Sequence, residues 1–422
     1  MNPKTILVAA LALIPAAQSP AGAAEAARSR SVKEGSAAAL AGAAGMVGSL
    51  SGGAALSGGV GGAVAAIGAA AARASLITPE EVERSIERGQ TYLLANQRAD
   101  GSWTVGTGAT SANTEYVRAA ITAYVLSALR GSSAEGVQGA IGRGEAYIDQ
   151  FGGTSTTTTR EGFGGNTQRL YALTLGLANS VSRTPSEEND MRVNAYIVEI
   201  SSLVRTTGST GYYGGTRPST FQLAMLAEAL REAREAGFHV SRRLLGTIHR
   251  DIESARSPDH GGFGYYTGGH TERAEGTASR SIANEVALAR AGRSTPARLT
   301  AALQRLMRAQ GLIGEVAAST TNFYSGGTTP HDPARQNIAA YYQLFGLYWG
   351  SEALAGLQPA EGAGYGHSLG RLLISIQRAD GSWRDSQVYA GPAYGTAMGI
   401  LSLRNCAQAI RRGERARRDS AR

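Results

Sequence analysis

Cysteine and lysine are almost absent from the 422-residue sequence. The single cysteine, Cys406, excludes an intramolecular disulfide and any metal site built from several thiolates. It lies in an apolar run over residues 400–410, which predicts a buried, unreactive thiol. The lysines are Lys4 and Lys33, both near the N-terminus. The remainder of the chain therefore has no lysine for Schiff-base or P-loop chemistry.

Positive charge is concentrated at one end of the chain. The formal net charge is +8, and residues 411–422 hold six arginines against Glu414 and Asp419. Half of the net charge therefore belongs to a short tail, and the rest of the chain is only mildly basic. A short terminal arginine cluster is typical of a solvated, frayed end. We expect a basic disordered tail over residues 411–422 and no nucleic-acid partner.

The first residues have the features of an export signal. Lys4 gives a positive start, an apolar run follows over residues 6–15, and Ala21-Gly22-Ala23 supplies the small residues of a cleavage site. The apolar run is too short to span a bilayer. We predict a signal peptide over residues 1–24 and a secreted or periplasmic location in a bacterial cell envelope.

Residues 25–77 form a low-complexity Gly/Ala/Ser segment that has two interpretations. Residues 35–72 contain no charged side chain. We favour a flexible linker, because the many glycines and serines lower its hydrophobicity. The alternative is a weak membrane segment, since Gly48 and Gly52 have the four-residue spacing of close helix packing. In that case residues 35–72 would associate the protein with a membrane.

From residue 78 to residue 410 the sequence alternates between two kinds of helix. Thr78-Pro79 is a good helix start, and an amphipathic pattern follows to Gln97. Residues 114–129 are apolar on nearly every side, which predicts burial all round. Further amphipathic, outer candidates lie at 137–150, 189–203, 241–255, 296–310 and 367–377. Further apolar, inner candidates lie at 167–178, 220–230, 277–289, 332–349 and 396–407.

A glycine-aromatic sequence separates each outer candidate from the inner candidate that follows it. These sequences recur at intervals of roughly 50 to 60 residues, which is typical of a chain built from stacked copies of one unit. Six helical hairpins form either an open solenoid or a closed ring. An inner set of helices that is apolar on every side favours closure. We predict an all-α domain, an α/α toroid of about six hairpins over residues 78–410.

Two segments resemble the QW repeat of the squalene and oxidosqualene cyclases. Arg88-Gly89-x-x-Tyr92-Leu93-x-x-x-Gln97-x-x-x-Gly101-x-Trp103 fits that repeat in full. The second segment keeps the last three positions of the repeat, as Gln377, Gly381 and Trp383. It has Ser368 and Leu369 at the first two positions, where the first segment has Arg88 and Gly89. The chain thus resembles the prenyltransferase and terpenoid-cyclase α/α toroid superfamily. The resemblance implies that these Gln, Gly and Trp residues are structural and tie an outer helix end to the next turn.

The residues that carry the known chemistry of this superfamily are missing. The Asp-x-Asp-Asp motif, with which squalene cyclases protonate an alkene, does not occur. Protein prenyltransferases bind zinc through an Asp two residues before a Cys, but Arg404 holds that position relative to Cys406. The Cys-Gly-Glu-Gln run of thioester domains is absent as well. The resemblance therefore implies the fold without these activities.

Most of the candidate catalytic residues lie in one polar loop, which contains two histidines and two glutamates within sixteen residues. Such side chains can bind a divalent metal or act as acids and bases. The alternatives are a solvated loop and, for the aspartate that precedes Pro333, a helix cap. The spacing matches no compact ligand motif, so we predict neither a metal nor a cofactor. The weak catalytic candidates are His260, His270, Glu272, Glu275, Glu285 and Asp332.

A second constellation predicts an anion site. Four arginines fall in or near the first turn of an inner helix, and these turns meet around one mouth if the ring closes. Helix N-termini also attract anions. An arginine collar above an apolar interior would suit an amphiphile with an anionic head, such as an isoprenoid phosphate. Ion pairing to nearby carboxylates is the alternative. The candidate ligand-binding residues are Arg118, Arg169, Arg280, Arg335, Tyr341 and Tyr342.

These observations leave three functions open. We favour an exported toroid that binds a ligand or an envelope protein as a non-catalytic binding or scaffold module. The second is an enzyme that acts on an isoprenoid or another lipid through residues that the superfamily does not use. The third is a carbohydrate-active α/α toroid, which would need two carboxylates across a groove.

Overall fold

The computed structural model describes residues 76–105, 114–150, 165–207, 219–267, 277–318, 343–385 and 391–422. The predicted signal peptide lies outside these residues, and so does the Gly/Ala/Ser segment apart from residues 76 and 77. Within them, regular structure is helical, and strand pairing is limited to isolated bridges such as the one between Gln97 and Trp103. No helix in these ranges is both long and apolar enough to cross a membrane.

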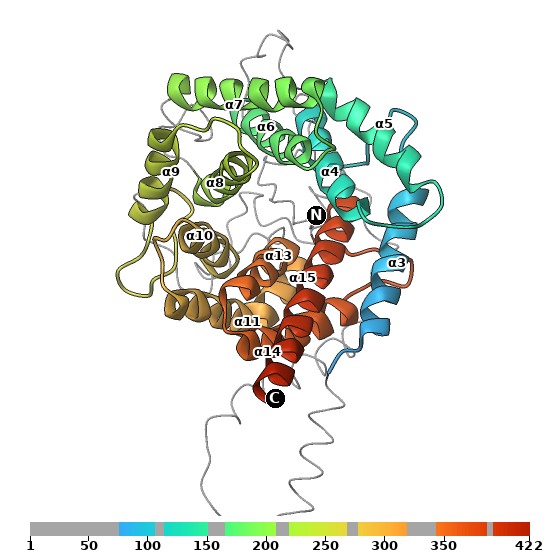
Figure 1. Cartoon of the computed structure of the whole chain (residues 1–422), viewed down its shortest axis with the longest axis vertical. Helices are drawn as coiled ribbons and strands as arrows, with labels where there is room; N and C mark the ends of the chain where they lie inside the picture. Colours follow the sequence, from blue (N-terminus) through green and yellow to red (C-terminus); the bar gives the residue numbers. More distant parts are fainter. Residues whose placement is uncertain are drawn as a thin grey trace, which may run out of the picture.

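The helices form two concentric sets (Figure 1). The inner set is α4 (Thr114–Leu129), α6 (Gly165–Val181), α8 (Thr220–Glu235), α10 (Ala278–Arg290), α13 (Gln343–Ala353) and α15 (Gly391–Ser420). The outer set is α3 (Pro79–Ala95), α5 (Val137–Asp149), α7 (Glu187–Thr207), α9 (Arg242–Ser254), α11 (Pro296–Ala318) and α14 (Pro359–Ser375). A 3-10 turn, η5 (Leu354–Gly356), joins α13 to α14.

The inner set closes into a ring. Each inner helix packs against the next in chain order, and α15 returns to pack against α4. The predicted all-α toroid with alternating outer and inner helices is therefore confirmed. Because each inner helix is followed by an outer helix that runs back, the six inner helices point the same way. Their first turns lie at one end of the ring and their last turns at the other.

Burial explains which helices take the inner positions. All residues of α10 from Ala278 to Leu288 are buried, and so is all of α13. The outer helix α9 buries only Leu245, Ile248 and Ile252, which share one face. A helix that is apolar all round is stable only where other helices surround it, whereas an amphipathic helix can cover the outside. The distribution of apolar residues around each helix therefore determines whether it lies in the inner or the outer set.

The predicted start of the folded domain is well defined. The Thr78 side chain accepts a hydrogen bond from the Glu81 amide at 3.2 Å, and the Glu81 carboxylate accepts one from the Thr78 amide at 2.8 Å. This capping box satisfies two N–H groups that the first turn of α3 would otherwise leave unpaired.

The prediction of a disordered C-terminal tail is wrong, because α15 continues through the arginine-rich residues to Ser420. Its last part packs on the end of α13 and the start of α14. Ala409, Ile410 and Gly413 are buried, and the Arg412 guanidinium donates to the carbonyl oxygen of Ala355 at 2.8 Å. Arginine favours helix, and cations near a helix C-terminus are stabilised by the helix dipole.

Candidate functional site

The two QW-like segments form joints between outer helices. The Gln97 side chain follows α3 and donates to the carbonyl oxygens of Gly101 at 2.9 Å and Ala140 in α5 at 2.8 Å. The Trp103 indole N–H donates to the carbonyl oxygen of Leu93 at 2.7 Å and so satisfies one of the free carbonyls at the end of α3. Each joint thus ties the end of one outer helix to the next outer helix.

The second joint closes the ring of outer helices. The Gln377 side chain donates to the carbonyl oxygens of Ser85 and Gly381, both at 2.9 Å, and accepts from the Ser85 hydroxyl at 2.7 Å. The Trp383 indole N–H donates to the Leu373 carbonyl oxygen at 2.7 Å. Ser85 lies in α3 and Gln377 directly follows α14, so this joint connects the last outer helix to the first.

Each joint requires glycine at its turn. Gly101 and Gly381 both have φ +85°, which side chains rarely tolerate. A Cβ atom would also lie 2.3 Å from the Arg143 carbonyl oxygen at the first joint and 2.5 Å from the Arg88 carbonyl oxygen at the second. The glycine is therefore fixed both by conformation and by the close approach of the neighbouring outer helix.

Each joint also contacts the inner helix that follows it. The Trp103 backbone N–H donates to the Thr122 hydroxyl in α4 at 3.4 Å, and the Trp383 backbone N–H donates to the Thr396 hydroxyl in α15 at 3.1 Å. The joints therefore set the rotation of α4 and α15 about their own axes.

The polar loop residues that the structure describes have structural partners. The His260 Nδ1 atom accepts from the Gly262 backbone N–H at 3.1 Å. Glu285 is buried in α10 and pairs with Arg256 at 2.7 Å. His270, Glu272, Glu275 and Asp332 lie outside the described residues. In the part of the chain that is described, no group of three His, Cys, Asp or Glu side chains is placed to hold a metal ion.

Three of the four collar arginines are described. Arg118 lies 3.9 Å from the Asp100 carboxylate, and Arg169 donates to Glu199 of α7 at 2.9 Å. Arg280 is 1% exposed, and its guanidinium carbon lies 5.3 Å from the centre of the Tyr265 ring. Arg335, Tyr341 and Tyr342 lie outside the described residues. The Arg280 guanidinium is thus placed over the face of an aromatic ring.

Aromatic side chains meet inside the inner ring. Phe221 of α8 and Phe345 of α13 lie edge to face with ring centroids 6.3 Å apart. Because α10 lies between α8 and α13 in the ring, this contact crosses the interior. On α13, Phe345 is followed at helical spacing by Tyr348, Trp349 and Glu352. That face of α13 therefore points into the ring.

A second group of rings continues this contact towards α4 and α15. Tyr124 of α4 and Tyr394 of α15 have centroids 5.7 Å apart, and Tyr348 and Trp349 have centroids 5.8 Å apart. Burial raises the pKa of the Tyr124, Tyr348 and Tyr394 hydroxyls well above the ordinary value. The Tyr348 phenol also contributes to the raised pKa of Tyr124. We call the following set the interior aromatic cluster: Tyr124, Phe221, Phe345, Tyr348, Trp349 and Tyr394.

Charged residues meet where the inner helices end. Arg290 of α10 pairs with Glu228 of α8 at 2.7 Å and with Glu352 of α13 at 2.5 Å. The Asn405 amide of α15 donates to Glu352 at 2.6 Å, and Arg231 pairs with Glu228 at 3.0 Å. Four consecutive inner helices are thus joined by one network, directly beyond the interior aromatic cluster along α13. We call it the inner charge network.

Glu232 belongs to this network and has an unusual carboxyl group. It lies 3.5 Å from Arg231. Burial raises the pKa of the Glu232 carboxyl well above the ordinary value of 4.5, and the neighbouring Glu228 carboxylate raises it further against the effect of Arg231. Glu232 also raises the pKa of the Tyr348 hydroxyl, after burial and Glu352. A protonatable carboxyl group therefore lies near the aromatic cluster.

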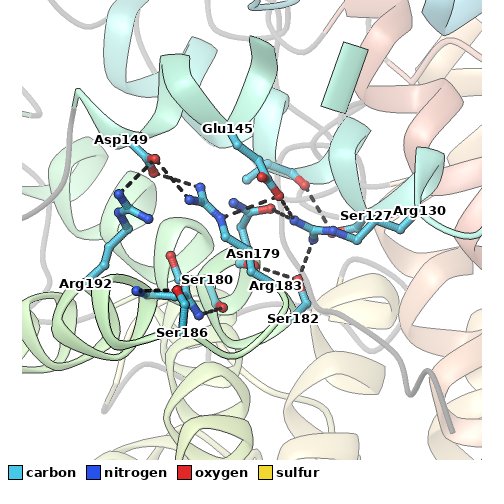
Figure 2. Close-up of polar contacts among 12 residues, drawn as sticks. Ser127, Arg130, Glu145, Asp149, Asn179, Ser180, Ser182, Arg183, Ser186 and Arg192 are labelled. Carbon is cyan, nitrogen blue, oxygen red and sulfur yellow. Dashed lines mark hydrogen bonds and ion pairs between the residues drawn. The ribbon is translucent and has the colours of Figure 1, made fainter. Parts of the chain in front are cut away.

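A separate network joins α4, α6, α5 and α7 at the same end (Figure 2). Arg130, just after α4, pairs with Glu145 of α5 at 2.6 Å. Arg183, just after α6, makes two hydrogen bonds to Asp149 at 2.8 and 3.0 Å, and Arg192 of α7 adds a contact to the same carboxylate at 3.2 Å. Arg130, Arg183 and Arg192 each have a carboxylate partner, so this network stabilises the end of the ring.

No protein-family model and no curated protein matches the sequence. Solved structures do. The chain is similar to the type II terpene cyclase MstE from Scytonema, with 14% identity over 79% of this chain and 100% of that chain and a TM-score of 0.45. It is similar to the GH76A α-1,6-mannanase from Salegentibacter, with 9% identity, 78% and 99% coverage and a TM-score of 0.48. A protein from Actinoplanes has 17% identity, 77% and 99% coverage and a TM-score of 0.42. At these identities the likeness concerns the fold and carries no activity with it.

Sequence reasoning missed the charged residues that join the inner helices. Glu228, Glu352 and Arg290 look like ordinary helix charges when taken singly. Asp385 was also missed. This buried side chain follows Trp383 and accepts from the backbone N–H groups of Gln343 at 2.9 Å and Leu344 at 3.1 Å, so it caps α13 from 41 residues away. Burial raises the pKa of the Asp385 carboxyl, while those N–H groups lower it.

Proposed function

We propose that this protein is a binding toroid that holds a largely apolar ligand inside its inner ring. The observation that carries the proposal is the contact between Phe221 and Phe345 across the ring, which continues through Trp349 and Tyr348 of α13. A scaffold needs only that its inner helices pack on their neighbours, and aliphatic side chains do this well. Aromatic side chains that face the interior of the toroid can stack on an apolar or unsaturated molecule.

An anionic head group fits the end of the ring where the inner helices begin. The Arg280 guanidinium lies over the Tyr265 ring, and that ring contacts Phe221 with centroids 5.6 Å apart. A cationic side chain is thus continuous with the interior aromatic cluster. This supports an amphiphile, such as an isoprenoid phosphate, with its head near Arg280 and its apolar part against the cluster. We place the protein in a bacterial cell envelope on the strength of its signal-like N-terminus.

Quenching of tryptophan fluorescence by a brominated fatty acid tests the proposal. The chain has three tryptophans, of which Trp103 and Trp383 lie in the outer joints and Trp349 lies in the interior cluster. Bromine quenches only on close contact, so a ligand inside the ring should reduce Trp349 emission saturably. Trp349→Phe should remove that component, and an unbrominated fatty acid should compete for it. Quenching that is unsaturable, or equal in Trp349→Phe, would exclude an interior site.

A second candidate function is proton-initiated chemistry on an isoprenoid. Glu232 supports it, because burial raises the pKa of this carboxyl well above the ordinary value, and the carboxyl in turn raises the pKa of the Tyr348 hydroxyl. Aromatic faces could then stabilise a developing cation. Incubation of the full chain with an isoprenoid alkene, followed by product analysis, tests this function. It requires turnover by the natural sequence and loss of turnover, with retained binding, in Glu232→Gln. If the protein binds the isoprenoid tightly but does not convert it, only the binding function stands.

A further inference from the structure

Three polar atoms of the interior aromatic cluster are buried and have no hydrogen-bond partner among the residues that the structure describes. One is the Tyr124 hydroxyl oxygen, which lies beside the phenol of Tyr171, and the other two are the Tyr394 hydroxyl oxygen and the Trp349 indole nitrogen. The side chains of Tyr394 and Trp349 are 0% exposed. A buried donor left unpaired costs about 1–3 kcal/mol, so native structures pair nearly all such groups. The Tyr394 and Trp349 donors therefore require an explanation.

The two donors belong to two neighbouring pairs of rings. Tyr394 contacts Tyr124, and Trp349 contacts Tyr348. The phenol of Tyr348 contributes to the raised pKa of the Tyr124 hydroxyl, so the two pairs lie near each other. The donors therefore come from the inner helices α15 and α13, through side chains that join one interior cluster. The indole nitrogen can only donate, and the tyrosine hydroxyl can donate as well.

We infer that the apolar part of the ligand carries hydrogen-bond acceptors, as a quinone or another carbonyl-bearing aromatic or isoprenoid molecule does, and that Trp349 and Tyr394 bind them. This inference rests on the proposed binding function and specifies the class of its ligand. Aromatic stacking accommodates the carbon skeleton, and the two donors select for carbonyl oxygens. A pure hydrocarbon would leave both donors unpaired and would lose their contribution.

A matched pair of probes tests the inference. Dimethylnaphthoquinone and dimethylnaphthalene share a carbon skeleton and differ by two carbonyl acceptors. Their dissociation constants for the full chain and its variants can be measured by equilibrium dialysis. Tyr394→Phe and Trp349→Phe should each weaken naphthoquinone binding about 2- to 10-fold, the effect of one hydrogen bond. Neither variant should weaken naphthalene binding to the same extent, because the apolar faces remain.

The chain offers a control for these substitutions. Tyr196 of α7 also has a buried hydroxyl without a partner among the described residues, but its ring packs on Gly176 of α6, outside the inner ring. Tyr196→Phe should leave the affinity for both probes unchanged. Removal of an unpaired hydroxyl is nearly neutral for folding. Melting temperatures of Tyr394→Phe and Tyr196→Phe close to that of the natural sequence would therefore show that affinity lost in Tyr394→Phe is not lost structure.

Two results would overturn the inference in different ways. If Tyr394→Phe and Trp349→Phe weaken both probes equally, or neither probe, the donors do not recognise acceptors, although the toroid still binds apolar molecules. If neither probe binds, the inference falls for this ligand class. Quenching of Trp349 by the brominated fatty acid then decides independently whether the proposed binding function stands.

Discussion

The joint between α14 and α3 should hold the toroid closed, and Gln377→Ala tests this directly. The Gln377 side chain donates two hydrogen bonds to carbonyl oxygens and accepts one from the Ser85 hydroxyl and one from the Arg88 guanidinium. At about 0.5–1.5 kcal/mol for each net hydrogen bond, their loss should lower the free energy of unfolding by about 2 to 6 kcal/mol. Ser85 is 2% exposed, so its carbonyl would lose a partner in a place that water reaches poorly.

The position of the joint predicts where the protein opens. Ser85 and Gln377 are 292 residues apart, and they belong to the first and the last outer helices. In Gln377→Ala, hydrogen exchange should therefore accelerate in α3 and α14 before it accelerates elsewhere. Gln97→Ala is the matched control, because Gln97 makes equivalent bonds to Gly101 and Ala140 between α3 and α5, two outer helices separated in the chain only by α4.

Urea unfolding gives the magnitude of the effect, and exchange monitored by mass spectrometry gives its location. Gln97→Ala should cost a similar free energy but should accelerate exchange around α3 and α5. A loss below about 0.5 kcal/mol in Gln377→Ala would mean that water replaces these bonds without cost. Identical exchange patterns in the two variants would refute the view that the Gln377 joint closes the ring.

Three further predictions concern the packing and the charges of the ring. Gly399→Ala would place a Cβ atom 2.6 Å from the Trp383 ring, so we expect a loss of about 1–3 kcal/mol in the free energy of unfolding, measured in urea. Arg290→Met removes the shared partner of the buried Glu228 and Glu352 and should cost about 3–5 kcal/mol in the free energy of unfolding, measured in urea. The raised pKa of Glu232 means that the folded state binds more protons than the unfolded state, so its contribution to stability is complete below the ordinary pKa of 4.5 and declines as pH rises above it. Glu232→Gln should therefore flatten the fall in melting temperature between acidic and neutral pH, and an unchanged pH profile would show that Glu232 does not titrate in this way.

The architecture could be predicted from the sequence because it depends on the polarity of whole segments. The run from Thr114 to Leu129 is apolar on nearly every side, and such a helix is stable only inside the fold. The QW-like segments added the joints, since glutamine after a helix end and a tryptophan six residues later form a local unit. Both patterns can be recognised even where the predicted helix boundaries are wrong by a few residues. The extension of α15 to Ser420 was missed because its stabilising contacts come from the ends of other helices, around Ala355 and Pro359.

The interior could not be predicted in the same way, because it depends on how each helix is rotated. Phe345 and Phe221 are 124 positions apart, and nothing local indicates that they face each other. Every residue of α13 is buried, so its pattern does not distinguish the face towards the ring centre from the faces towards its neighbours. Asp385 poses the same difficulty, since the amides that it caps belong to another hairpin.

The joints and the interior are nevertheless coupled through two threonines. Thr122 receives its hydrogen bond from the Trp103 backbone and lies two residues before Tyr124. Thr396 receives its bond from the Trp383 backbone and lies two residues after Tyr394. Two residues correspond to about 200° around a helix axis, so a threonine turned towards an outer joint directs the tyrosine to the opposite side, into the ring.

The contact between Tyr124 and Tyr394 therefore follows from the same segments that hold the outer wall together. Both joints act at the place where the ring closes, between α15 and α4, and both orient a tyrosine at that place. The resemblance to the QW repeat is evidence for the fold, but its consequence is also chemical. Because each joint fixes the rotation of an inner helix, it positions a phenol of the interior, including the Tyr394 hydroxyl that we assign to the ligand. A substitution in a joint should then alter ligand binding as well as stability, although no joint residue belongs to the interior cluster.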